Sequence, residues 1–67
     1  MEKEKIGFTK EQRIFMEENN IDSDNLVQVF EKTDEMLIKK GFDENYNPTE
    51  IGVMCESILD TLVDMGF

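Results

Sequence analysis

Acidic side chains recur at helical spacing near the end of this sequence. Glu56, Asp60 and Asp64 are four residues apart, so on a helix they form one row along a single face. Like charges at this spacing repel by roughly 0.2–0.5 kcal/mol per pair, so the row does not stabilise the helix. Glu50 and Val53 fall on the same side, which places an apolar side chain among carboxylates. The pattern predicts either a binding surface for a basic protein or a face that serves solubility alone.

Side chains suited to catalysis are scarce. Cys55 is the single thiol, and the chain has no His that could activate it. Its spacing places it on the apolar side of the same helix, so we interpret it as a core residue. Glu56 and Asp60 could in principle exchange protons with a substrate, but a chain this short leaves little room for a pocket. We therefore expect no catalytic residue, no cofactor and no enzymatic activity.

The loop that precedes this helix begins like a calcium-binding loop. Asp43, Asn45 and Asn47 place oxygen atoms at the first, third and fifth loop positions. The sixth position, which requires Gly for a sharp turn, is occupied by Pro48, and the twelfth, which requires a bidentate Glu, by Met54. The sequence therefore predicts a capped turn and no metal site.

Composition limits the remaining function classes. The 67 residues include 16 acidic and 7 basic side chains, which gives a formal net charge of −9. A single domain covering residues 1–67 is expected, and a chain of this size buries only about 60% of its unfolded surface. The negative charge disfavours direct binding to nucleic acids and to anionic membranes. Because no apolar stretch resembles a signal peptide or a membrane span, we expect a cytoplasmic protein.

Three helix starts can be predicted from capping patterns. Thr9–Gln12 has the form of a capping box, in which the Thr hydroxyl and the Gln amide each bond a free backbone N–H. Asp22 is the expected N-cap of the second helix, with Ile21 packing on Leu26. Asn47 is the expected N-cap of the third helix, followed by a proline, with Tyr46 packing on Ile51.

The helix ends also share a pattern. Asn20, Gly41 and Gly66 each follow a helical segment and precede an apolar residue, as in helix stops with a left-handed cap. Together with the starts, these ends predict an all-α, three-helix domain with helices at about 9–19, 23–40 and 48–65. Residues 1–7 are short, charged and end in Gly, so we expect a frayed, disordered N-terminus.

The second helix, 23–40, has an apolar arc wider than one neighbouring helix requires. Asp34 falls inside this arc, between Phe30 and Ile38, so that part of the arc either lies at a seam between helices or meets another molecule. Ile14 on the first helix is a further apolar residue with no clear place in the core. These features allow a homodimer.

Residues 41–60, with the sequence GFDENYNPTEIGVMCESILD, resemble the C-terminal stretch of short, acidic, uncharacterised helical proteins of Gram-positive bacteria and their phages. The resemblance implies a small helical protein and transfers no activity and no site residue. Our main hypothesis is therefore a non-catalytic protein-interaction module whose acidic helical face, with Val53 at its centre, meets a protein with a basic surface. The alternatives are a nucleic-acid mimic that inhibits a DNA- or RNA-binding protein, and a self-assembling homodimer.

Overall fold

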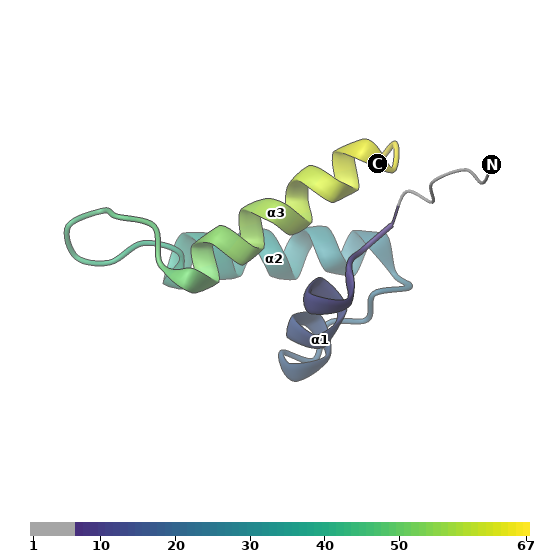
Figure 1. Cartoon of the computed structure of the whole chain (residues 1–67), viewed down its shortest axis with the longest axis horizontal. Coiled ribbons are helices and arrows are strands. Elements are labelled where there is room, and N and C mark those ends of the chain that lie inside the picture. The colour runs from purple at the N-terminus through teal and green to yellow at the C-terminus, as the bar shows by residue number, and fades with distance from the viewer. Residues whose placement is uncertain (1–6) are drawn as a thin grey trace.

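The computed structural model describes residues 7–67 and confirms an all-α, three-helix fold (Figure 1). The helices are α1 (Lys10–Glu18), α2 (Leu26–Lys40) and α3 (Glu50–Asp64). The expected frayed segment, residues 1–7, lies outside the described residues except for Gly7, which forms a bend before α1. Within residues 7–67, no helix is long and apolar enough to cross a membrane.

Helix α1 begins as its capping box predicts, whereas α2 begins later than expected. The Thr9 hydroxyl accepts from the Gln12 N–H at 3.1 Å, and the Gln12 amide oxygen accepts from the Thr9 N–H at 2.9 Å. The N-cap of α2 is Asn25, whose side chain accepts from the Gln28 N–H at 3.1 Å. The predicted cap, Asp22, instead accepts from the Asp24 N–H at 3.0 Å within a turn that precedes the helix. This local side-chain bond competes with helix formation, which explains the later start.

The start of α3 also differs from the prediction. Its N-cap is Thr49, whose hydroxyl oxygen accepts from the Gly52 N–H at 3.0 Å, and not Asn47. Pro48 precedes the helix and forms an isolated antiparallel bridge with Phe42. Tyr46 has a positive φ of 65° and is 85% exposed, so the expected packing of its ring on the helix does not form.

Two of the three predicted left-handed helix stops are confirmed. Asn20 after α1 has a φ of 60°, and Gly66 after α3 has a φ of 88°. In both stops the next N–H donates to a carbonyl five residues earlier, as a Schellman motif requires. These bonds join Ile21 to Met16 at 2.8 Å and Phe67 to Leu62 at 3.0 Å.

The third predicted left-handed stop is wrong, because Gly41 after α2 has a right-handed φ of −79°. Glycine is needed there for space. A Cβ at Gly41 would overlap the Leu37 carbonyl, and a Cβ at Gly52 would overlap the carbonyl of Gly41. The end of α2 therefore contacts the first turn of α3 backbone to backbone.

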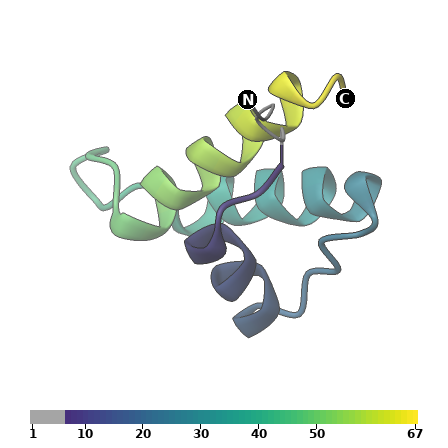
Figure 2. The ribbon, with the colours of Figure 1, turned by 45° about the vertical axis from the view of Figure 1, so that its right-hand side comes forward.

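Helices α2 and α3 form an antiparallel hairpin, and α1 packs across one side of it (Figures 1 and 2). The Gln12 amide of α1 donates to the hydroxyls of Ser57 at 3.0 Å and Thr61 at 3.2 Å on α3. The buried apolar cluster draws on all three helices and on the segment after α1. Its members are Met16, Ile21, Val29, Ile58 and Leu62.

Candidate functional site

The predicted site residues all lie on the exposed side of α3, a surface we call the acidic face. Its members are Glu50, Val53, Glu56, Asp60 and Asp64. Val53 is 58% exposed, so the expected apolar side chain among carboxylates is present. The opposite side of α3 supplies the core residues Cys55, Ile58 and Leu62. The alternation of buried and exposed positions along α3 thus presents the carboxylates to solvent.

No carboxylate of the acidic face forms an ion pair with another residue of the 7–67 segment. The ion pair found in this segment joins Lys39 and Glu35 on α2, with 2.9 Å between Nζ and Oε2. The hydrogen bond from Lys39 lowers the pKa of Glu35, but the pair is exposed and contributes little to stability. The charges of the acidic face are therefore available to an external partner.

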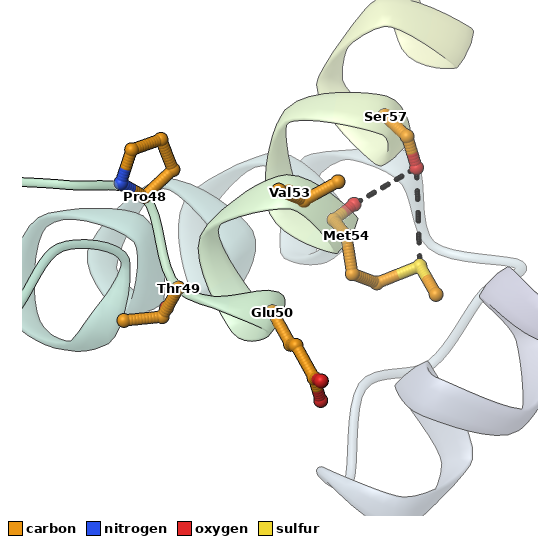
Figure 3. Close-up of a pocket in the computed structure, with 6 residues that line it drawn as sticks. All are labelled: Pro48, Thr49, Glu50, Val53, Met54 and Ser57. Carbon is orange, nitrogen blue, oxygen red and sulfur yellow. Dashed lines mark hydrogen bonds between the residues drawn. The ribbon is translucent and has the colours of Figure 1, made fainter.

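A shallow, mostly apolar groove of about 360 Å³ lies at the start of α3 (Figure 3). It is lined by Pro48, Thr49, Glu50, Val53, Met54 and Ser57. In Figure 3 the Val53 side chain lies between Pro48 and Ser57, and the Glu50 carboxylate points away from the proline ring. The Ser57 hydroxyl donates to the Met54 carbonyl at 3.0 Å, so its polar group is already satisfied. The groove therefore offers a small apolar contact with one carboxylate at its edge.

Two of the five predicted residues, Glu50 and Val53, line the groove. Glu56, Asp60 and Asp64 continue the acidic face along α3 outside the groove. The arrangement is therefore an apolar contact at the N-terminal end of α3 and a row of charge toward its C-terminal end.

The position of the groove depends on contacts between the ends of α2 and α3. The Thr49 hydroxyl donates to the Lys40 carbonyl at 2.8 Å while it accepts from the Gly52 N–H. The Thr49 N–H donates to the Gly41 carbonyl at 2.8 Å. These bonds tie the first turn of α3 to the last turn of α2 and so position Pro48 beside Val53.

Comparison of the chain with protein-family models, with curated proteins and with solved structures found no match. The site must therefore be interpreted from its own chemistry.

Cys55 is fully buried, as the sequence predicted. Burial raises the pKa of its thiol, because desolvation disfavours the charged thiolate. A neutral, buried thiol is a poor nucleophile, so Cys55 contributes packing to this part of the fold.

The loop that begins like a calcium site forms a turn held by its own first residue. Asp43 Oδ1 accepts from the Asn45 N–H at 2.8 Å and from the Asn47 N–H at 2.9 Å. The carboxylate oxygen is thus directed at the backbone of its own loop. This geometry agrees with the capped turn expected from the sequence.

Two features of the surface were not identified from the sequence. Met54 and Ser57 line the groove, and Met54 is at the same time partly buried against the apolar core. Val63 is 73% exposed and follows Asp60 by three residues, so it adds a second apolar group beside the acidic face. Helical spacing could have located Val63, because residues three apart are neighbours on a helix surface.

Proposed function

We propose that this protein is a non-catalytic interaction module whose acidic face binds a protein with a basic surface. The observation that carries the proposal is Val53, a mostly exposed apolar side chain in an apolar groove at one end of a row of carboxylates that form no ion pair within residues 7–67. A face that served only solubility would need the charges but not the groove.

The two parts of the surface have different roles in the proposed binding. The carboxylates attract a basic partner over distances of about 8–10 Å at ordinary salt concentrations and so raise the association rate. Val53 and the groove exclude water over a small area, which slows dissociation. In this proposal the carboxylates favour basic proteins as a class, and the groove determines which basic proteins bind tightly.

Affinity capture from a lysate of the source cells, followed by measurement with the purified partner, tests the proposal. The test variant carries Glu56→Lys, Asp60→Lys and Asp64→Lys. Each reversal adds two charges, so the net charge changes from −9 to −9 + 6 = −3. A matched control carries Glu17→Lys, Glu18→Lys and Asp24→Lys, three exposed positions away from α3 with the same change in net charge.

We expect the control to retain the partners of the parent protein and the test variant to lose them. A second variant, Val53→Ser, should weaken binding of the purified partner with little effect on its association rate. Recovery of the same partners by the parent, the test variant and the control would contradict the proposal. If the captured partner binds DNA or RNA in competition with this protein, the acidic face acts as a nucleic-acid mimic instead.

A further inference from the structure

A second exposed apolar surface lies on the α2–α3 hairpin, away from the groove. We call it the apolar strip. It consists of Val27, Phe30, Ile38, Val63 and Phe67, which are between 43% and 73% exposed. The Phe30 and Phe67 rings contact each other with 5.8 Å between their centroids, which joins the α2 part of the strip to the C-terminal part. The contact between Phe30 and Phe67 forms an exposed apolar patch across the two helices, and exposed apolar patches are typical of interaction sites in soluble proteins.

The apolar strip is on the side of the hairpin that α1 leaves uncovered. Helix α1 is bonded to Ser57 and Thr61 of α3, and the segment after it accepts a bond from Lys32 of α2. On α2, Phe30 and Ile38 are eight residues apart and so share a stripe, whereas Lys32 lies on the opposite flank. The α2 residues of the strip are thus the part of the wide apolar arc of α2 that the fold does not bury.

Among the residues that the structure describes, the charged side chains beside the apolar strip are acidic. Asp34 is half-buried between Phe30 and Ile38, four residues from each, and Glu31 follows Val27 by four residues. On α3, Glu56 precedes Val63 by seven residues and so shares its stripe. The basic side chains of α2 lie toward α1, where they line a second shallow groove together with Asn19. They are Lys32, Lys39 and Lys40.

This charge pattern favours a basic occupant. A second copy of the chain would bring Asp34 and Glu31 against the same acidic strip, with no basic group from residues 7–67 on either surface to compensate. An amphipathic helix from another protein could bury its apolar face on the strip and place Lys or Arg beside Asp34, Glu31 and Glu56. We propose that the apolar strip binds a basic amphipathic helix of a partner protein. The proposal uses a different apolar contact from the Val53 groove and holds even if that groove binds nothing.

Titration of the full chain, labelled for amide NMR, with a synthetic peptide of Leu and Lys tests this inference. The peptide has about 18 residues, roughly five helical turns, with Leu on one face. A peptide of the same composition in scrambled order keeps the charge and removes the apolar face. We expect the amphipathic peptide to shift the signals of Val27, Phe30, Val63 and Phe67, and to bind about tenfold more tightly than the scrambled peptide.

Variants of the strip separate this binding from simple charge attraction. Val27→Ser with Val63→Ser changes two exposed positions and should weaken peptide binding about tenfold while the circular dichroism spectrum stays that of the parent. Ile14→Ser, an exposed apolar position on α1, is the matched control and should bind as the parent does.

Three results would overturn the inference. The first is that the two peptides bind with equal affinity. The second is that the amphipathic peptide shifts only the amide signals of Glu50 and Val53. The third is that sedimentation without peptide shows a dimer of the parent and a monomer of the Val27→Ser, Val63→Ser variant. The Val27→Ser, Val63→Ser variant leaves all five residues of the acidic face unchanged, so failure of this inference leaves the proposed function intact.

Discussion

Replacement of Gly52 by Ala tests whether the junction of α2 and α3 is as tight as the structure indicates. Gly52 lies in the first turn of α3, and a Cβ there would overlap the carbonyl oxygen of Gly41 and lie 2.9 Å from its carbonyl carbon. The obstructing atoms belong to the backbone and cannot rotate away. Gly52→Ala should therefore force α3 away from the end of α2.

The expected loss of stability follows from two opposing effects. Overpacking costs about 1–3 kcal/mol, and the upper end applies because backbone must move. Alanine regains up to about 1 kcal/mol over glycine inside a helix. The net loss is then about 2 kcal/mol, a large part of the roughly 3–10 kcal/mol expected for a domain of this size. At about 4–8 °C per kcal/mol, the melting temperature should fall by about 8–16 °C.

Urea and thermal unfolding followed by circular dichroism measure this loss. The control is Val53→Ala, the adjacent exposed position of the same helix, which should stay within about 0.5 kcal/mol of the parent. A Gly52→Ala variant as stable as the parent, or more stable, would refute the reasoning, because helix propensity would then outweigh the contact with Gly41. Amide NMR should also show shifted signals for the residues next to Pro48 and for Val53, because the junction of α2 and α3 positions the groove.

Two further predictions concern buried polar groups. The Thr33 Oγ1 is buried without a hydrogen-bond partner among the described residues, so Thr33→Val should stabilise the protein by about 1 kcal/mol in urea unfolding; a destabilised Thr33→Val would contradict this. Burial raises the pKa of the Cys55 thiol in the folded protein. The neutral thiol therefore stabilises the fold fully below the pKa of the unfolded chain, about 8.5, and this stabilisation is lost as the pH rises above that pKa. Above about pH 8.5 the free energy of unfolding should therefore fall with pH in the parent and fall less in Cys55→Ala. An equal fall with pH in the two proteins would contradict this prediction.

The number of helices and two of the three left-handed stops could be predicted from the sequence because they depend on local signals. The capping box at Thr9 and the stops at Asn20 and Gly66 involve residues only a few positions apart. The starts of α2 and α3 could not, because several side chains compete for the same backbone groups. Asp22 and Asn25 are both good N-caps, and the choice between such residues depends on which turn packs against the rest of the fold.

The candidate site was predictable to the same extent and for the same reason. Helical periodicity placed Val53 among exposed carboxylates, because neighbours on one helix follow from spacing alone. The groove could not be found this way, since it requires the approach of Gly52 to Gly41, a contact between residues of two helices. A pattern of apolar and polar residues contains no information about which backbone atoms meet.

The uncovered side of the hairpin shows why a small fold can leave a binding surface open. An α2–α3 hairpin has two sides, and a single short helix can cover only one of them. Polar contacts act together with the burial of Met16 in selecting this side, because Gln12 donates to Ser57 and Thr61, and these hydroxyls occur on one flank of α3 only. A sequence pattern that distinguishes only polar from apolar residues therefore does not predict which apolar flank of the α2–α3 hairpin remains exposed. The bonds of Gln12, together with the buried Met16, thus place α1 on one flank and leave the apolar strip exposed on the other.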